Sequence, residues 1–320
     1  MKNFALIGAA GFIAPRHLSA IKETNNKLIC AYDPYDGVGV MDSFFPDADF
    51  FTEFERFDRH LDKQRRSGNK VDYISVCSPN YLHDSHIRFG LRSGSDVICE
   101  KPLVLNSRNI DALETLEREY GNKIFTILQL RYHKDILELK RRVEASDLEA
   151  VYDVDLTYLT SRGKWYYTSW KGDDDKSGGI STNIGVHFFD MLTWIFGEVI
   201  GMKVHLNTHD RASGLLELKR AKVRWFLSVN YDLIPEEIKL KGQRTFRSIT
   251  VNGKELEFSS GFTELHTKSY EAILKGEGYS INDTRTAIEV VQGIRDNDVV
   301  PMLDDFHPFS KFPICKHPFK

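Results

Sequence analysis

Five short apolar segments, separated by amphipathic ones, organise the first part of this 320-residue chain. The apolar segments are residues 3–8, 27–32, 72–77, 96–99 and 123–130, and the amphipathic segments are residues 14–24, 82–92, 107–120 and 134–145. Their lengths and periods predict buried strands and helices, respectively. Strands that alternate with helices indicate a parallel sheet with helices on both faces. Residues 34–70 are less regular, and their pattern does not decide a structure.

The pattern changes near residue 150, where a second domain is expected. Strands are expected at 151–160, 199–207, 213–219, 222–231, 245–251 and 254–258, and helices near 181–196, 262–275 and 281–296. The dipeptide Asn252-Gly253 predicts a hairpin turn between the last two strands. The sequence therefore predicts an α/β protein with a Rossmann dinucleotide-binding domain over residues 1–130. An α+β domain with an open, mostly antiparallel sheet is expected over residues 131–320, for substrate binding and oligomerisation.

The composition excludes several classes of partner. A formal net charge of −3 gives no reason to expect a nucleic acid or a membrane surface. No apolar run approaches the length of a membrane span. The four cysteines show neither a C-x-x-C pair nor zinc-like spacing, and the histidines show no metal-ligand spacing. We therefore expect a cytoplasmic protein without a metal site.

A glycine turn between the first strand and the first helix is the first candidate for cofactor binding. Gly8 permits the turn, and Gly11 lets the backbone approach a pyrophosphate, beside Phe12 and Ile13. The turn matches the dinucleotide fingerprint incompletely, so a purely structural turn is the alternative. Asp33 ends the second strand about 20–25 residues on, where a carboxylate binds the adenosine ribose and repels a 2′-phosphate. This favours NAD over NADP; the alternative is an ordinary turn residue beside Pro34.

Polar residues also follow the later strands of the predicted sheet. They are Ser78, Asn80 and His83 after the third strand, Glu100 and Lys101 after the fourth, and Gln129 at the end of the fifth. In open α/β sheets, ligands bind outside the carboxyl ends of the strands. We therefore expect these residues to meet the cofactor.

Several motifs resemble those of the glucose–fructose oxidoreductase and inositol 2-dehydrogenase superfamily. They are GAAGFIA at 8–14, SPNYLH at 78–83, CEKPL at 99–103 and a Gly-rich helix motif from Gly178 to Asp190. Within this superfamily, the chain is similar to the UDP-N-acetyl-2-amino-2-deoxy-D-glucuronate 3-dehydrogenases. That similarity lies in residues 130–133, 156–173, 183–192, 221–229, 247–253 and 261–274. One departure is Asn183, where the superfamily usually carries Asp.

The resemblance implies an NAD-dependent sugar-nucleotide 3-dehydrogenase. Its reaction would convert the 3-hydroxyl of UDP-N-acetyl-D-glucosaminuronate to a ketone, on the route to a diamino uronic acid of a bacterial surface polysaccharide such as lipopolysaccharide O-antigen. An aminotransferase would act downstream, and 2-oxoglutarate is a possible hydride acceptor because some relatives keep the nicotinamide bound. The resemblance also implies a homotetramer or homodimer.

Two residues are candidates for proton transfer. Lys101 would serve as a base if burial beside the positive nicotinamide ring favours its neutral form. His187 lies on the expected helix with Asn183 and Asp190 at i, i+4 and i+7, which makes one stripe. The alternatives are a surface lysine and a core histidine. The sequence leaves open which of the two is the primary base.

Substrate-binding residues are expected mainly in and before the loop that follows residue 160. Arg162, Lys164 and Lys171 would hold a diphosphate, and Trp165 or Trp170 would stack on uracil, near Tyr158. Arg16 and Arg131 are candidates for the sugar carboxylate, and Asn183 for a sugar hydroxyl. The alternative is that the aromatic residues pack in the core and the charges are solvated.

Other functions remain open from the sequence. The same superfamily contains NAD-dependent glycosidases, which oxidise C3 transiently and eliminate the aglycone, and other sugar or polyol dehydrogenases. A nucleotide sensor without catalysis is a third possibility, but it would lack residues like Lys101 and His187.

Overall fold

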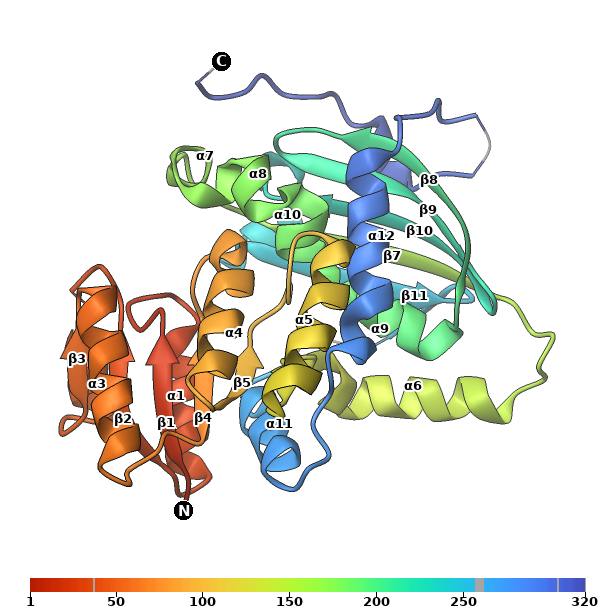
Figure 1. Ribbon diagram of the computed structural model, residues 1–320. Helices are drawn as coiled ribbons and strands as arrows, with labels where there is room; N and C mark the ends of the chain where they lie inside the picture. Colours follow the sequence, from red (N-terminus) through yellow and green to blue (C-terminus); the bar gives the residue numbers. More distant parts are fainter. Residues whose placement is uncertain (37, 257–261, 304, 320) are drawn as a thin grey trace. The chain divides into compact units, whose positions relative to one another are not determined.

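The computed structural model describes residues 1–36, 38–256, 262–303 and 305–319, and Figure 1 shows its elements. The chain forms two compact units. The first contains Met1–Tyr132 and Thr263–Arg285, and the second contains His133–Phe262 and Thr286–Lys320. The expected division was a single cut at residue 130, whereas in the structure a later segment returns to the first unit.

The first unit is built on a six-stranded parallel sheet, in the order β3-β2-β1-β4-β5-β6. Its strands are β1 (Asn3–Ile7), β2 (Lys27–Tyr32), β3 (Asp49–Phe51), β4 (Tyr73–Val76), β5 (Asp96–Cys99) and β6 (Ile124–Thr126). This is the strand order of dinucleotide-binding folds, with its switch point between β1 and β4. The expected Rossmann domain is thereby confirmed. Of these strands, β3 falls in residues 34–70, where the sequence decided no element.

Helices flank this sheet, and one of them comes from late in the chain. They are α1 (Ala14–Glu23), α2 (Val38–Phe44), α3 (Phe54–Arg66), α4 (His83–Arg92), α5 (Ser107–Tyr120) and α11 (Leu265–Leu274), with 3₁₀ turns at Asn80–Leu82, Gln129–Tyr132 and Asn282–Thr284. Helix α11 packs against α1. The ring of Tyr270 stacks on Phe4 of β1, with centroids 5.8 Å apart. The buried face of α11 thus explains why residues 263–285 belong to the first unit.

The second unit contains a mixed six-stranded sheet, in the order β12-β11-β7-β10-β9-β8. Its strands are β7 (Tyr152–Thr160), β8 (Val199–Asn207), β9 (Arg211–Leu218), β10 (Ala221–Ser228), β11 (Thr245–Val251) and β12 (Lys254–Glu255). Strands β7 and β10 are parallel, and the other described pairs are antiparallel, as expected. Asn252 and Gly253 make the hairpin turn with positive φ angles of 51° and 74°. Residues 257 and 258 of the last expected strand lie outside the described residues.

Helices and short turns complete the second unit. They are α6 (Lys134–Ala145), α7 (Trp165–Thr168), α8 (Asp174–Ser177), α9 (Val186–Phe196), α10 (Glu236–Lys239) and α12 (Arg285–Asp296), with a π-helical turn at Ser181–Gly185 and 3₁₀ turns at Trp170–Gly172, Tyr231–Leu233 and Pro308–Lys311. The strand expected to reach residue 231 ends at Ser228. Its last residues instead form a turn, because the Asn230 side chain accepts a hydrogen bond from the backbone N–H of Asp232.

Helix α9 packs closely on one face of this sheet. The ring of Phe189 meets Trp225 of β10 edge to face, with centroids 5.2 Å apart. On the opposite face, Phe226 stacks on His307 and contacts Phe309, which follow α12. The sheet is therefore covered by α9 on one face and by part of the C-terminal segment on the other.

Replacing Gly185 with alanine is expected to destabilise the second unit. The new Cβ would lie 2.5 Å from Cδ1 of Leu227 and 3.0 Å from the ring of Phe189. Overpacking of this kind costs about 1–3 kcal/mol. Calorimetric melting would measure the loss, with Gly39→Ala as the control because an added Cβ there meets nothing within 4 Å. An unchanged melting temperature for Gly185→Ala would contradict the close packing of α9.

Candidate functional site

The turn after β1 is shaped by contacts that leave no room for a side chain. Gly8 has φ 94°, and a Cβ there would lie 2.6 Å from backbone atoms of Cys77 and Ser78. The backbone N–H groups of Gly8 and Ala9 donate to the carbonyl oxygen of Tyr32, at 2.8 and 3.2 Å. The glycine is therefore required because two strand ends meet at this turn.

The start of α1 faces the same turn. No side chain caps the helix, whose N-cap residue is the half-buried Ile13. The positive end of the helix dipole is thus placed at the glycine turn, as in dinucleotide-binding folds. Gly11 donates to the Gly8 carbonyl at 3.1 Å, and Phe12 is 97% exposed. A fully exposed aromatic ring at this position is unusual for a residue that serves only to fold the turn.

Asp33 ties the end of β2 to this turn. One carboxylate oxygen accepts a hydrogen bond from the backbone N–H of Ala10 and the other from that of Tyr35, both at 2.9 Å. The side chain is 6% exposed. A carboxylate fixed in this way suits a ribose diol and disfavours a 2′-phosphate.

The loops after β4 and β5 are joined by His83. Its Nδ1 lies 2.7 Å from the carbonyl oxygen of Pro102, and its Nε2 lies 2.8 Å from that of Ser78. The ring is 1% exposed, so it holds the two loops together, and a direct contact with the cofactor stays a prediction. Asn80 is also buried, and Ser78 Oγ lies 2.8 Å from His86 Nδ1.

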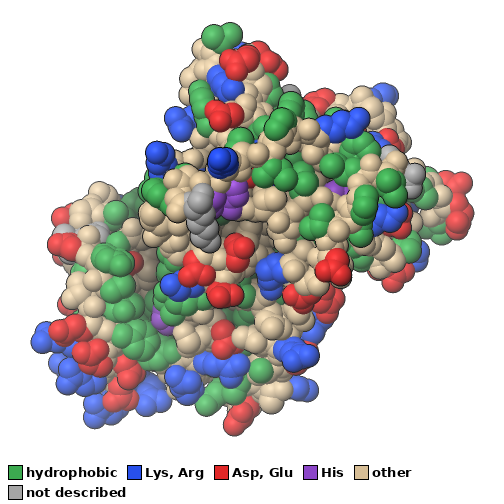
Figure 2. Space-filling view, turned by 90° about the horizontal axis from the view of Figure 1, so that it is seen from above, with side chains coloured by type: hydrophobic (Ala, Val, Ile, Leu, Met, Phe, Trp, Pro, Cys, Tyr) green, Lys and Arg blue, Asp and Glu red, His purple; other side chains and the backbone are tan. Residues whose placement is uncertain are grey.

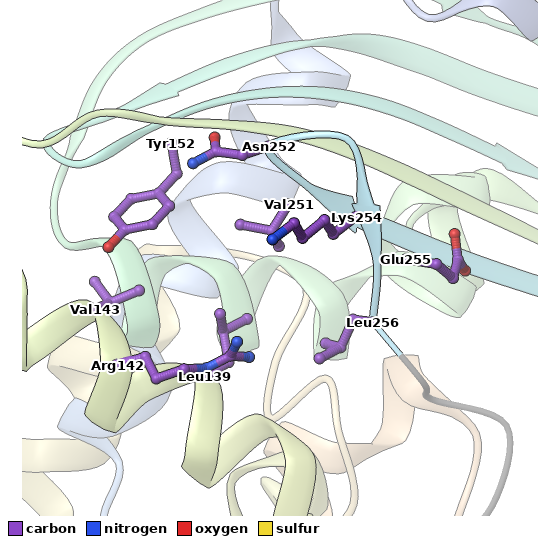
Figure 3. Close-up of a pocket in the computed structure, with 9 residues that line it drawn as sticks. All are labelled: Leu139, Arg142, Val143, Tyr152, Val251, Asn252, Lys254, Glu255 and Leu256. Carbon is purple, nitrogen blue, oxygen red and sulfur yellow. The ribbon is translucent and has the colours of Figure 1, made fainter.

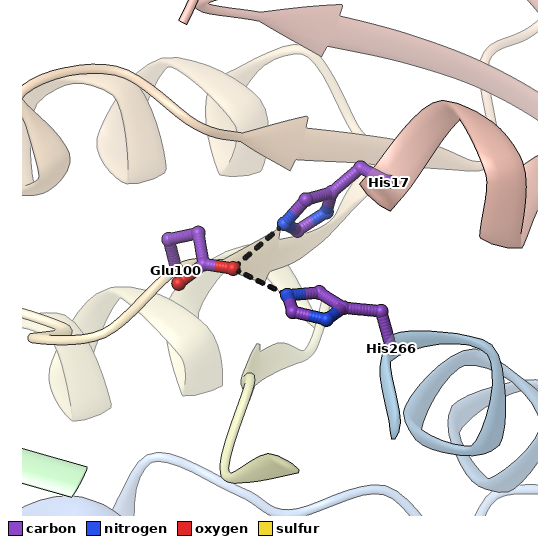
Figure 4. A group of neighbouring side chains, drawn as sticks. All are labelled: His17, Glu100 and His266. Carbon is purple, nitrogen blue, oxygen red and sulfur yellow. Dashed lines mark hydrogen bonds and ion pairs between the residues drawn. The ribbon is translucent and has the colours of Figure 1, made fainter. Parts of the chain in front are cut away.

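A buried carboxylate lies directly before Lys101. Figure 4 shows His17 of α1 and His266 of α11 pointing at Glu100, where the Nε2 atom of each ring lies 2.9 Å from Glu100 Oε1. The other oxygen of Glu100 accepts a hydrogen bond from the backbone N–H of Lys101 at 3.2 Å. Lys101 itself is half-buried and precedes a cis peptide bond.

A chain of hydrogen bonds extends this cluster into the core. His17 Nδ1 lies 2.7 Å from the hydroxyl of Tyr270, which lies 2.6 Å from Ser75 Oγ. One arrangement satisfies every group: Ser75 donates to Tyr270, Tyr270 donates to His17, and His17 donates to Glu100. The three groups His17, Glu100 and His266 place ligand atoms within 4.8 Å of one another. Each of these ligand atoms takes part in one of the hydrogen bonds described above.

The pKa shifts agree with this arrangement. Burial lowers the pKa of His17, so its ring is neutral and donates through Nε2. Burial alone would raise the pKa of Glu100, but the hydrogen bonds from His17 and His266 bring it well below its usual range. An ionised carboxylate is therefore held next to Lys101 by two donors.

Three further predicted residues of the first unit have distinct surroundings. Gln129 opens the 3₁₀ turn after β6, and its buried Oε1 has no hydrogen-bond partner among the described residues. An unsatisfied acceptor at a strand end suits a ligand donor such as a carboxamide.

Arg16 donates to the Thr263 carbonyl at 3.2 Å. Arg131 is 5% exposed, lies over the Tyr279 ring, and bonds the carbonyl and carboxylate of Asp283, so part of its guanidinium is already engaged.

In the second unit, the π-helical turn and α9 present two polar side chains. Across residues 181–192, only Asn183 and His187 are less than fully buried. Asn183 Nδ2 donates to the hydroxyl of Tyr166 at 3.2 Å. The His187 ring meets Tyr158 edge to face, with centroids 6.0 Å apart. The structure thus brings Asn183, His187 and Tyr158 together, with Tyr166, which the sequence did not single out.

The loop after β7 carries the remaining predicted residues. Trp165 is 53% exposed and Lys164 is exposed, whereas Arg162 is half-buried and bonds the Ser161 carbonyl. The ammonium of Lys171 lies 3.8 Å from the ring centroid of Trp170. The loop therefore combines cations with aromatic rings, and its binding of a nucleotide stays a prediction.

A separate groove lies between α6 and the β11–β12 hairpin (Figure 3). It measures about 290 Å³ and is lined by Leu139, Arg142, Val143, Tyr152, Val251, Asn252, Lys254, Glu255 and Leu256. None of the predicted site residues lines it.

On the face drawn in Figure 2, basic and acidic side chains are intermixed, in keeping with the small net charge. No helix in the described part of the chain is long and apolar enough to cross a membrane.

Two family models match the chain. Residues 2–128 match an oxidoreductase family with an NAD-binding Rossmann fold, and residues 140–255 match the C-terminal alpha/beta domain of the same family. The chain belongs to this oxidoreductase family. The expected resemblance, the fold class and the NAD cofactor are thereby confirmed at the level of the family. The glycine turn, Asp33 and Gln129 fit a bound dinucleotide.

Solved structures and curated proteins of similar sequence were also found. The WlbA (WbpB) dehydrogenase from Thermus thermophilus, in complex with NAD and alpha-ketoglutarate, is 48% identical, with 97% of this chain and 100% of that chain covered and a TM-score of 0.93. Its complex with NAD and UDP-GlcNAcA gives 47% identity, the same coverage and a TM-score of 0.92. The D-glucoside 3-dehydrogenase of Escherichia coli (strain K12) is 27% identical over 128 residues, 40% of this chain and 36% of that protein. The chain spans half or less of the first curated relatives it matches.

Replacing Tyr270 with phenylalanine is expected to destabilise the first unit. The change removes the hydroxyl that joins His17 to Ser75 and leaves both buried groups without this partner. Losses of this kind cost about 1–3 kcal/mol. Thermal unfolding would measure the effect against Tyr120→Phe, where the ring is 41% exposed. Equal melting temperatures for the two variants would refute the role assigned to the buried hydroxyl.

The stability of the first unit is expected to fall in mild acid. Burial lowers the pKa of His86 to about 4, below the value of about 6.5 for an unfolded histidine. The unfolded chain therefore takes up the proton first, so the contribution of neutral His86 is complete above about pH 6.5 and declines toward pH 4. Between pH 7.5 and 5.5, His86→Gln should lose about 1 kcal/mol less than the unmodified protein. Calorimetry at both pH values would test this, and parallel losses would contradict it.

Proposed function

We propose that this chain oxidises the 3-hydroxyl of UDP-N-acetyl-D-glucosaminuronate to a ketone, with NAD as the oxidant. The observation that carries the proposal is the 47% identity over the whole length of the Thermus thermophilus dehydrogenase, whose structure contains NAD and UDP-GlcNAcA. The side chains needed for this chemistry are in suitable surroundings. Lys101 follows a fixed carboxylate in the first unit, and His187 and Asn183 are the accessible polar groups of their segment in the second.

Specific residues would hold the cofactor. Gly8, Gly11 and the start of α1 would receive the pyrophosphate, Asp33 the adenosine ribose, and Gln129 a donor group of the ligand. NAD, when bound, accepts the hydride from the sugar carbon. Phe12, Ile13, Ser78, Asn80, His83 and Glu100 would form or support the walls of this site.

Lys101 and His187 would manage the proton of the reacting hydroxyl. A neutral amine or imidazole can accept that proton while the carbon loses its hydride. Glu100 fixes the backbone at Lys101 through the hydrogen bond to its N–H, which limits the positions that the side chain can reach. The Tyr158 ring contacts His187 and restricts its orientation.

The nucleotide half of the substrate would bind to the loop after β7. Arg162, Lys164 and Lys171 offer cations for the diphosphate, and Trp165 and Trp170 offer rings for uracil. Asn183 would bond a sugar hydroxyl. Arg16 and Arg131 remain predicted ligands of the sugar carboxylate, beside the hydrogen bonds that Arg16 donates to the Thr263 carbonyl and Arg131 donates to Asp283.

The proposal extends to the setting of the reaction. Alpha-ketoglutarate in the Thermus thermophilus structure supports 2-oxoglutarate as the acceptor that reoxidises bound NADH. A 3-keto sugar nucleotide is a substrate for an aminotransferase, which fits a cytoplasmic route to a diamino uronic acid of a surface polysaccharide such as O-antigen. A homotetramer or homodimer is the expected assembly.

Incubating the protein with NAD and UDP-N-acetyl-D-glucosaminuronate, with and without 2-oxoglutarate, tests the reaction directly. Mass spectrometry should show the loss of two hydrogens from the sugar nucleotide, and 2-hydroxyglutarate should appear if the cofactor is recycled. Lys101→Met and His187→Asn should each lower kcat by about 100-fold or more. Lys63→Met, at an exposed position of α3, should leave kcat unchanged.

The outcomes separate the parts of the proposal. An unchanged sugar nucleotide in the presence of protein that binds NAD would reject the substrate and leave the cofactor assignment intact. Full activity of Lys101→Met would reject only the proton-transfer role of Lys101 and leave the substrate and the cofactor assignments intact.

A further inference from the structure

Arg247 lies on the same face of the second sheet as the candidate catalytic histidine. It is paired directly opposite Tyr158 in the antiparallel register of β11 and β7. Residues directly opposite one another project to the same side of a sheet. The Tyr158 ring contacts His187 and Phe188 of α9, with centroids 6.0 and 4.8 Å apart. Arg247 is therefore on the face covered by α9.

The guanidinium of Arg247 is held by aromatic rings. Its central carbon lies 5.4 Å from the ring centroid of Tyr158 and 4.5 Å from that of Phe262. Among the residues that the structure describes, no carboxylate pairs with it. Aromatic contacts orient a guanidinium without neutralising its charge, so its N–H groups remain able to bind an anion.

Arg224, on the opposite face of the same sheet, shows the contrast. It forms ion pairs with Asp153, Asp155 and Asp305. Arg247, by contrast, is a partly buried cation that two aromatic rings hold in position.

We propose that Arg247 binds the carboxylate of the uronate sugar and so selects UDP-N-acetyl-D-glucosaminuronate over UDP-N-acetylglucosamine; this rests on the proposed function. Arg247 and His187 both flank the Tyr158 ring, so one sugar ring can reach both groups. The planar guanidinium matches a carboxylate in two parallel hydrogen bonds. The loop residues Arg162 to Lys171 supply cations for the diphosphate. Arg16 and Arg131, the residues expected at the sugar carboxylate from the sequence, already donate to the Thr263 carbonyl and to Asp283, and Arg247 takes their place in this assignment.

The test compares Arg247→Met and Arg247→Lys with the unmodified protein. Methionine keeps an unbranched apolar stem against Phe262 and removes the charge, and lysine keeps the charge and loses the planar fork. KM for UDP-N-acetyl-D-glucosaminuronate should rise about 30- to 100-fold in Arg247→Met, and less in Arg247→Lys. The affinity for UDP should stay within about threefold, because the diphosphate contacts are elsewhere. The preference for the uronate over UDP-N-acetylglucosamine should fall by about the same factor as KM rises.

Lys222→Met is the matched control, because it removes a cation from the opposite face of the sheet, where Lys222 pairs with Asp305. Its KM values should not change. Each variant is first checked for NAD binding and melting temperature, and Arg247→Gln replaces Arg247→Met if the latter does not fold. Unchanged KM for the uronate, or equal weakening for the uronate and for UDP, overturns the assignment. Failure of the unmodified protein to oxidise the uronate refutes the proposed function instead, and the assignment falls with it.

Discussion

The arrangement of the first unit's candidate site depends on one buried carboxylate. Glu100 accepts hydrogen bonds from two histidines that come from α1 and α11, and it accepts a third from the backbone N–H of Lys101. Charge-assisted bonds of this kind offset the desolvation of a buried anion, which would otherwise favour protonation. One of the two histidines, His266, comes from the segment 263–285 that returns to the first unit. The position of Lys101 is thereby coupled to a helix formed far along the chain.

The second unit positions its polar groups by a different means. Its π-helical turn before α9 is a feature that is frequent at functional sites, and here it carries Asn183 on the accessible side. Aromatic rings hold both His187 and Arg247 in place. Rigid rings orient these groups at little entropic cost.

Much of the fold could be predicted because its signals are local. Strand length, helix period and the Asn252-Gly253 turn each depend on neighbouring residues, as do the roles expected of Gly8 and Asp33. The His17–Glu100–His266 cluster could not be predicted in this way, because its partners are 83 and 166 residues apart. One sequence signal was the pair His266 and Tyr270, polar residues spaced i and i+4 on the helix face that also carries Leu265 and Ile273. Arg247 opens the segment 247–253 that carries part of the family similarity, but it was not singled out as a site residue because an arginine in a strand is most often solvated.

The exchange of the family's usual Asp for Asn183 changes which protons the second unit can offer. Asn183 donates through Nδ2 to the oxygen of Tyr166. Burial raises the pKa of Tyr166 to about 12, so this hydroxyl keeps its proton near neutral pH. Because the oxygen already accepts from Asn183, the O–H remains available to donate to another acceptor. An Asp at the same position would instead accept a hydrogen bond from the Tyr166 hydroxyl and place a negative charge there. With Asn183, the same side chains favour an anionic sugar by offering a donor in place of a charge.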